Sequence, residues 1–303
     1  MFSACPEDRI SAMCAEADFE QIARLLTTHA FSWDIERALE LALFRTYAMP
    51  SISSLLARTG EFAARPAKRY DDTELLLSEP LENGLDSARG RAAISRINEM
   101  HGHYRIANDD MIYVLGTFVL EPIRWLDRFG RRAMTPHEQR AWTNYYRALG
   151  ERLGIRDIPA DLAGFAAFNA RAERERRRFA PSNREVAQAT LDLLLGFYLP
   201  RGLFGLGRPV VLALLDPPLR EAMGLPHPSR ALRIGVPAAM RLRRLVLRAL
   251  PRRRRPRLVT ARWRAGYPEG YEIAALGTWP AARPGACPRG GALSREGRGS
   301  AAR

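Results

Sequence analysis

Hydrophobic residues recur along this chain at the spacing of three and four residues that is typical of amphipathic helices. No stretch alternates polar and apolar residues over a useful length, and the sequence contains no internal repeat. The pattern therefore predicts an all-α protein, a single multi-helix domain with roughly eight to ten helices around one core. The clearest helical segments are 18–29, 35–48, 51–59, 94–105, 111–127, 136–153, 185–199 and 229–250.

Two apolar segments depart from the amphipathic pattern. Residues 111–120 are apolar on nearly all sides, which predicts a central, buried helix. Residues 193–215 are also strongly apolar, but Gly, Pro and Arg interrupt them, and no run reaches the ~20 apolar residues that a membrane span needs. We therefore expect an apolar hairpin over residues 200–218 and no transmembrane helix.

Capping residues mark where several helices should begin. Thr135 and Glu138 form a capping box with Pro136 at the first helical position, and Ser182 and Glu185 form a second box. Further helix starts are expected at the N-caps Asp34 and Asp161 and at the carboxylate pairs Asp71-Asp72 and Asp109-Asp110. For the two pairs, capping and compensation of the helix dipole explain the carboxylates better than acid–base chemistry does.

The 303-residue chain carries a formal net charge of +14, almost all of it from arginine, because Lys68 is the only lysine. No Asp or Glu lies between Glu221 and Glu269, and this span includes four consecutive arginines at 252–255. Such a basic region fits an anionic membrane or nucleic acid. Because no nucleic-acid recognition motif or interleaved aromatic pattern accompanies it, we expect no nucleic-acid partner.

Cysteine content and the two termini bear on compartment and domain organisation. Three cysteines without a CxxC pair indicate neither a disulfide framework nor a cysteine-based metal site, and the first residues lack the pattern of a signal peptide. We expect a cytoplasmic protein, either free or peripheral on the inner face of the membrane. We expect an N-terminal extension over 1–33 and a main domain over 34–279, and composition predicts a disordered Pro/Gly/Arg-rich tail over 280–303.

The segment with the most informative chemistry contains two histidines. At 100° per residue, Ile94, His101 and Arg105 lie on one side of a helix, whereas His103 lies on the other. We therefore expect His101 to point inward, Arg105 to follow it one turn along on the same side, and His103 to face water. A neutral imidazole beside a guanidinium suits a metal or haem ligand next to an anion clamp, although spacing alone favours a structural histidine bound to a backbone carbonyl.

Motifs of the commonest enzyme classes are missing. The sequence has no GxGxxG, no Walker loop, no GxSxG and no HExxH. Nucleotide binding, serine hydrolysis and zincin chemistry are therefore not indicated.

Several loose elements follow one another in a specific order. Arg69 and Thr73 form an R-x-x-x-T element, and His101 and Arg105 form an H-x-x-x-R element. The apolar helix at 111–120, the capping box at 135–138 and the stretch 267–277 come next. In order and spacing, these elements resemble the MpaB-type oxygenase family, which includes the catalytic domain of rubber oxygenase (latex clearing protein). The resemblance covers about residues 34–277.

The resemblance implies a globin-like all-α fold that holds one b-type haem. It implies that His101 is the iron ligand, that Arg105 lies near a haem propionate, and that Arg69 and Thr73 act near the haem, where they would stabilise developing negative charge. Rubber-cleaving members carry a lysine just before the threonine, where this chain has Asp72. This difference argues against polyisoprene as the substrate and leaves the ligand on the far side of the iron undefined.

The sequence therefore leads to two hypotheses. The first is a haem b-dependent oxygenase or oxidoreductase that acts on O2 and a small hydrophobic substrate, of isoprenoid or lipid kind, with His101 on the iron. The alternative is a non-catalytic all-α protein that docks peripherally on anionic membranes through its apolar hairpin and the arginines that follow. The two can also hold together. Reaction type and oligomeric state are not indicated by the sequence.

Overall fold

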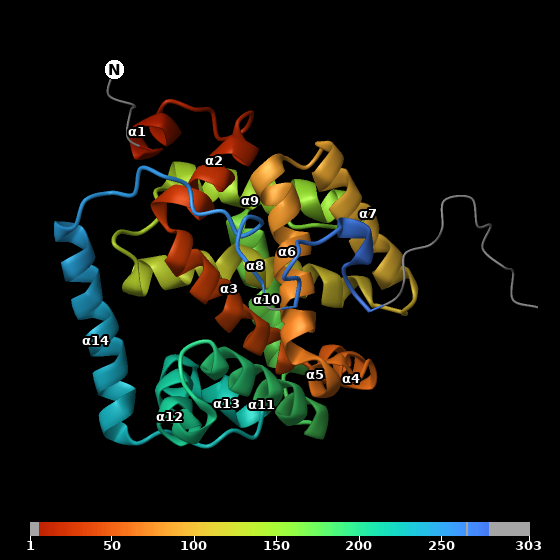
Figure 1. Cartoon of the computed structure of the whole chain (residues 1–303), viewed down its shortest axis with the longest axis vertical. Coiled ribbons are helices and arrows are strands. Elements are labelled where there is room, and N and C mark those ends of the chain that lie inside the picture. Colours follow the sequence, from red (N-terminus) through yellow and green to blue (C-terminus); the bar gives the residue numbers. More distant parts are fainter. Residues whose placement is uncertain (1–5, 265, 279–303) are drawn as a thin grey trace, which may run out of the picture.

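Helices α3 (Ser32–Tyr47) and α8 (Asn108–Phe129) form the centre of the fold and pack along each other (Figure 1). The computed structural model describes residues 6–264 and 266–278. Helices α9 (Pro136–Arg152) and α10 (Leu162–Arg176) pack against α8 on other sides. Because helices surround α8, most of its side chains are buried, which confirms the central helix predicted from residues 111–120.

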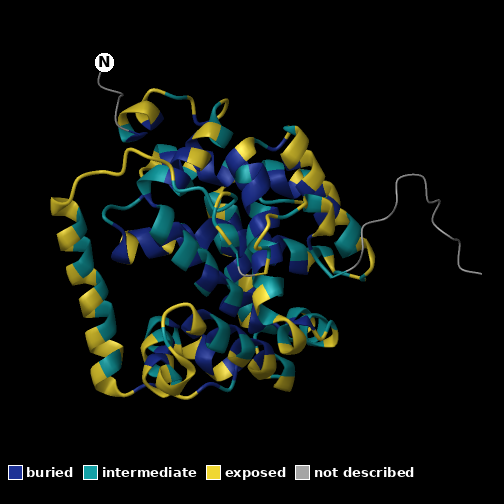
Figure 2. Ribbon diagram, viewed as in Figure 1, coloured by how far each residue is buried: buried dark blue, intermediate teal, exposed yellow. Residues whose placement is uncertain are grey.

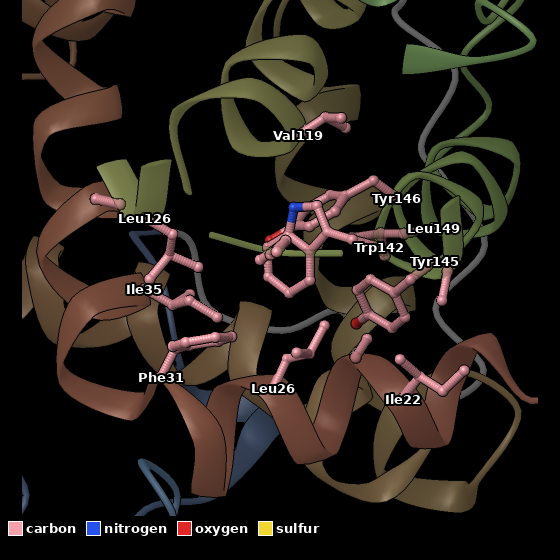
Figure 3. Close-up of a cluster of buried hydrophobic side chains, with 14 of the residues drawn as sticks. Ile22, Leu26, Phe31, Ile35, Val119, Leu126, Trp142, Tyr145, Tyr146 and Leu149 are labelled. Atoms are coloured by element: carbon pink, nitrogen blue, oxygen red, sulfur yellow. The ribbon is translucent and has the colours of Figure 1, made fainter. Parts of the chain in front are cut away.

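The largest core lies between α8, α9 and the N-terminal part of the chain. The short helix α2 (Phe19–Leu25) packs on α9, and α1 (Pro6–Ser11) and the π-helical turn at Leu26–Ala30 pack beside α2. Residues 6–33 therefore contribute directly to this core. Aromatic side chains of α9 meet aliphatic side chains of the N-terminal helices there (Figure 3). The labelled members are Ile22, Leu26, Phe31, Ile35, Val119, Leu126, Trp142, Tyr145, Tyr146 and Leu149.

A second core joins the C-terminal half of α3 to a group of shorter helices. These are α4 (Pro50–Arg58), α5 (Glu61–Ala64), α11 (Pro181–Gly196), α12 (Phe204–Leu214) and α13 (Pro217–Ala222). The expected apolar hairpin over 200–218 is therefore wrong, because most of this segment is helical. Gly207 allows α12 to pack closely on α11: a Cβ at this position would lie 2.6 Å from side-chain carbons of Leu195 and Leu199.

Helices α6 (Pro66–Asn83) and α7 (Ala88–Gly102) lie side by side on one flank (Figure 1). The long helix α14 (Arg230–Ala249) stands at the opposite edge in this view, and the chain then returns across the molecule. We call the described residues 257–264 and 266–277 the C-terminal strap. The strap crosses α6 and ends beside α7, where it forms a short 3-10 turn at Ile273–Ala275.

Some helix starts agree with the capping predictions and others do not. The Thr135–Glu138 capping box and the Asp161 N-cap are confirmed. The second capping box is wrong: α11 begins at Pro181, and the Ser182 hydroxyl lies 2.9 Å from that of Ser53 instead of capping its own helix. Asp34 is not a cap either, because α3 already begins at Ser32.

The all-α, single-domain prediction is confirmed. Within residues 6–264 and 266–278 the structure is 71% helical and has no strand, only an isolated bridge between Arg264 and Tyr267. It has 14 α-helices in this part of the chain, more than expected, because four of them span seven residues or fewer. No helix there is both long and apolar enough to cross a membrane. The predicted disordered tail at 280–303 lies outside the described residues.

Candidate functional site

His101 lies in the last turn of α7, on the flank where α7 packs against α6. Its Nδ1 atom is fully buried and has no hydrogen-bond partner among the described residues. Burial, together with the smaller effect of the positive charge of Arg69, lowers the pKa of this imidazole to about 4. The side chain is therefore neutral at pH 7, as a metal-binding imidazole must be.

Arg69 and Thr73 lie one turn apart on α6 and are in direct contact. The Nη1 of Arg69 donates to the Thr73 hydroxyl, and that hydroxyl donates to the Arg69 carbonyl at 2.9 Å. The guanidinium also lies 5.6 Å from the ring centre of Phe62. The positive charge of Arg69 contributes to lowering the pKa of His101, and it also acts to lower the pKa of the buried Tyr47 phenol. The structure thus brings Arg69, Thr73 and His101 to the same part of the fold.

Aromatic rings from two elements line the Arg69 side of this region. The ring of Tyr47 on α3 meets Phe62 on α5 edge-on at a centroid distance of 5.8 Å, and it meets Phe44 at the same distance. Burial raises the pKa of Tyr47 to about 12, so its hydroxyl stays protonated at neutral pH. The guanidinium of Arg69 therefore lies at the edge of an aromatic wall formed by Phe62, Tyr47 and Phe44.

Arg105 is not where the helical pattern placed it. Helix α7 ends at Gly102, and Arg105 lies in the exposed loop that leads to α8. The expected one-turn spacing to His101 is therefore wrong, since the helix stops before reaching Arg105. The expected exposure of His103 is confirmed. A role for Arg105 at a haem propionate remains a prediction.

The carboxylate pair Asp71-Asp72 was expected to begin a helix, and this is wrong. Helix α6 already begins at Pro66, so both side chains lie inside it, and both are buried. Asp71 accepts from Arg264 of the strap at 2.8 Å, and Asp72 accepts from Lys68 at 2.7 Å and from the Tyr267 hydroxyl. The pair thus binds the strap. The other pair, Asp109-Asp110, does lie in the first turn of its helix, α8.

Two glutamates flank the R-x-x-x-T element in the sequence, and both are occupied by arginines. The buried Glu61 pairs with Arg65 at 2.5 Å, and the half-buried Glu74 pairs with Arg264. Burial raises the pKa of Glu74, and Arg264 opposes this increase. Neither carboxylate is placed as a free base beside His101.

Sequence reasoning missed a polar cluster around the buried Arg45, away from His101. The guanidinium of Arg45 on α3 contacts Glu121 at 2.8 Å, Glu173 at 3.0 Å and Asp216 at 2.5 Å. The Tyr113 hydroxyl donates to Glu173 at 3.2 Å. A cavity of about 270 Å³ borders this cluster, but His101, Arg69 and Thr73 do not line it. One indication of this cluster is present in the sequence: each of its charged residues lies within or next to an apolar helical segment.

A family model described as "ER-bound oxygenase mpaB/B'/Rubber oxygenase, catalytic domain" matches residues 37–249, more than half of the chain. The chain belongs to this family. The resemblance indicated by the motifs is thereby confirmed, and the strap lies beyond the matched segment.

Three fungal relatives are similar over parts of the chain. The ER-bound oxygenase mpaB' of Penicillium brevicompactum is 31% identical over 229 residues, which are 70% of this chain and 54% of that protein. The ER-bound oxygenase mpaB of Penicillium roqueforti (strain FM164) is 29% identical over 236 residues, 72% of this chain and 79% of that protein. The mpaB of P. brevicompactum is 35% identical over 134 residues, 42% of this chain and 34% of that protein. The chain thus spans about half the length of the first of these relatives. Family and relatives are all named as oxygenases, in agreement with the expected enzyme class.

A b-type haem, which the resemblance implies, needs a neutral axial ligand from the protein, because the porphyrin supplies four ligands itself. His101 fits this requirement: its imidazole is neutral, and Nδ1 is buried without a partner. No backbone carbonyl accepts a hydrogen bond from Nδ1. His101 is therefore not a structural histidine held at this atom by a backbone carbonyl. Within the described ranges no group of three or more His, Cys, Asp or Glu side chains is placed to hold a metal ion.

Proposed function

We propose that this protein is a haem-dependent oxygenase in which His101 binds the iron of a b-type haem. The observation that carries the proposal is the neutral imidazole of His101 next to Arg69, whose Nδ1 atom is buried and has no hydrogen-bond partner. An unpaired polar atom in a protein interior costs free energy, which binding to a cofactor removes. The family and its named relatives support the oxygenase class.

Three residues of this chain would have separate roles at the site. His101 holds the cofactor through a lone pair that no protein donor uses. Arg69, fixed by Thr73 and by the ring of Phe62, presents a permanent positive charge that stabilises negative charge developing nearby. Tyr47 stays protonated and can act only as a neutral hydrogen-bond partner. When bound, the haem would supply the binding and activation of O2.

The substrate proposed is a small hydrophobic molecule, of isoprenoid or lipid kind. The aromatic wall formed by Phe44, Tyr47 and Phe62 supports this class, because apolar rings favour an apolar ligand and exclude water. The presence of Asp72, bound to Lys68 and the strap, supports a substrate other than the rubber polymer. Arg105 would contact a haem propionate from its exposed loop.

Haem content tests the proposal, with two neighbouring histidines as a matched pair. The wild type, His101→Ala and His103→Ala are purified alongside one another, and haem per protein is measured by absorption after extraction. We expect haem in the wild type and in His103→Ala, and at least a tenfold loss in His101→Ala. Retention of haem by His101→Ala, with loss in His103→Ala, would overturn the assignment.

A further inference from the structure

Helix α14 is attached to the body of the protein along one side only. It stands at the edge of the molecule in Figure 1, and it has no fully buried residue, as its yellow and teal colouring in Figure 2 shows. Its inner side packs through Met240 against the large core. Arg243 fixes the same side, since it pairs with Asp34 at 2.8 Å and lies 4.0 Å from the ring centre of Trp33.

The opposite side of α14 carries a second apolar stripe that nothing in the described structure covers. Ile234, Ala238, Leu242 and Leu245 follow one another at spacings of four, four and three, so they share one helical face. The exposed fractions of Ile234, Leu242 and Leu245 are 63%, 62% and 58%. Large apolar side chains aligned at the surface of one helix mark a contact site, because their exposure to water is unfavourable.

The neighbouring helix α12 also exposes apolar side chains. It packs against α14, and its Leu206 is 74% exposed, with the exposed Val210 one turn further on. Two exposed arginines, Arg230 and Arg241, lie on the helical face that borders the apolar stripe of α14. The helix contains no acidic residue, and none occurs between Glu221 and Glu269. The surface therefore combines apolar insertion with positive charge.

The apolar stripe and the positive charge together indicate which kind of partner covers this surface. A second copy of the chain would bring its own arginines against these, and like charges across an interface are unfavourable. Nucleic acid would satisfy the arginines but would leave the apolar stripe in water. An anionic bilayer satisfies both, because the apolar face enters the acyl boundary while the arginines reach the lipid headgroups.

We propose that α14, with α12 beside it, docks this protein on the surface of an anionic lipid bilayer, with the helix axis parallel to the membrane plane. The apolar stripe from Ile234 to Leu245 enters the headgroup boundary, and Arg230 and Arg241 contact anionic headgroups. The contact is peripheral, since no described helix is long and apolar enough to span the membrane. This inference does not depend on haem binding.

Liposome flotation of the full-length protein tests the proposal. Vesicles of phosphatidylcholine alone are compared with vesicles that contain about 30% phosphatidylserine. The test variant is Leu242→Glu/Leu245→Glu. Its control is Phe179→Glu/Trp263→Glu, which changes the net charge equally at two exposed apolar residues away from α14. Both pairs are exposed, so folding is retained, and circular dichroism checks this.

We expect the wild type and the control to float with the anionic vesicles, and the test variant to bind at least about tenfold more weakly. Arg230→Gln/Arg241→Gln should also weaken binding to anionic vesicles about tenfold. Equal binding by the test variant and the control, or no binding by the wild type, would overturn the proposal. So would a wild-type dimer in lipid-free solution that Leu242→Glu/Leu245→Glu converts to a monomer, since a second copy would then cover the stripe.

Discussion

At the scale of single residues, burial sets the charge state of several carboxylates. Glu40 on α3 accepts from Arg37 at 2.6 Å and from the Tyr70 hydroxyl at 2.8 Å. Burial nevertheless raises its pKa from 4.5 to about 7, with the charge of Arg37 acting in the opposite direction. Between these two pH values the folded protein keeps a proton that the unfolded chain has lost. Glu40 therefore reduces stability progressively as the pH rises through this window.

Replacing Glu40 should remove this pH dependence. The stability of Glu40→Gln, relative to wild type, should increase by about 2 kcal/mol between pH 5 and pH 8, because the neutral amide has no proton to lose. Urea unfolding of both proteins at the two pH values measures this difference. Glu151→Gln, at an exposed position on α9, is the control and should follow the wild type. An equal pH dependence in Glu40→Gln and wild type would contradict the prediction.

Arg69 and Arg105, the two arginines that the sequence placed near His101, should differ in their effect on the pKa of this histidine. Arg69→Leu should raise the pKa of His101 in the haem-free protein above its value of about 4, because the charge of Arg69 helps to lower it. The pKa should remain below 6.5, since burial is the larger cause. Arg105→Leu, in the exposed loop, should leave the pKa unchanged. Titration of the imidazole by NMR measures all three, and an equal shift in both variants would argue against the arrangement described here.

At the scale of elements, helix α6 and the C-terminal strap form one unit held by buried charge. Asp71, Asp72 and Glu74 bind Arg264, Lys68 and Tyr267, and further along α6 two more buried carboxylates bind the strap. These are Glu79, which accepts from Tyr271, and Glu82, which accepts from the backbone of Val259 and Thr260. The acids of α6 therefore hold the segment that covers the helix carrying Arg69 and Thr73.

Breaking the central ion pair of this unit should be costly. Arg264→Met should lower the free energy of unfolding by about 3 kcal/mol, because it leaves the carboxylates of Asp71 and Glu74 buried without their cation. Arg208→Met removes an exposed partner of Asp192 and should cost less than about 1 kcal/mol. Urea unfolding compares the two variants. A loss for Arg264→Met no larger than for Arg208→Met would show that the strap contributes little to stability.

Local patterns predicted the elements better than the contacts between them. The apolar segment at 111–120 has to be buried whatever surrounds it, so its central position could be predicted from the sequence. The Thr135–Glu138 capping box is satisfied within its own helix and was also predictable. Asp71 and Asp72 were misread because their partners lie in the strap, nearly 200 residues later in the chain. The glycines and prolines of 200–218 favoured a hairpin in the sequence, whereas Gly207 lies inside α12 and allows this helix to pack closely on α11.

The same distinction applies to the candidate site. The inward orientation of His101 followed from helical periodicity, and the neighbourhood of Arg69 and Thr73 followed from the family resemblance. The end of α7 at Gly102 was not encoded in the periodicity, because the pattern continues formally to Arg105. The Arg45 cluster requires charges from α3, α8, α10 and the loop before α13 to meet, which no single stretch of sequence indicates.

At the scale of the whole molecule, the strap near the end of the described chain binds residues near its beginning. The backbone N–H of Arg257 donates to the Thr28 carbonyl at 2.8 Å, and Arg262 pairs with Glu36 at 2.7 Å. The N-terminal helices, α3, α6 and the strap therefore depend on one another, and the site on α6 and α7 is a product of the complete fold. Ligand binding at such a site stabilises the folded state as a whole.

Hemin should therefore raise the thermal stability of the haem-free wild type. The midpoint of thermal unfolding is expected to rise with hemin concentration, because a ligand that binds only the folded state shifts the equilibrium toward it. His101→Ala should show a much smaller increase, and His103→Ala should respond as the wild type does. Equal increases in all three proteins would indicate that hemin binds elsewhere.

The visible absorption spectrum of the purified full-length protein tests the central claim most directly. The account predicts a Soret band in the wild type, as isolated or after addition of hemin and gel filtration, with about one haem per chain. It predicts that His101→Ala, treated in the same way, elutes without this band. A wild-type protein that stays colourless after hemin treatment, or a His101→Ala variant with an unchanged spectrum, would contradict it.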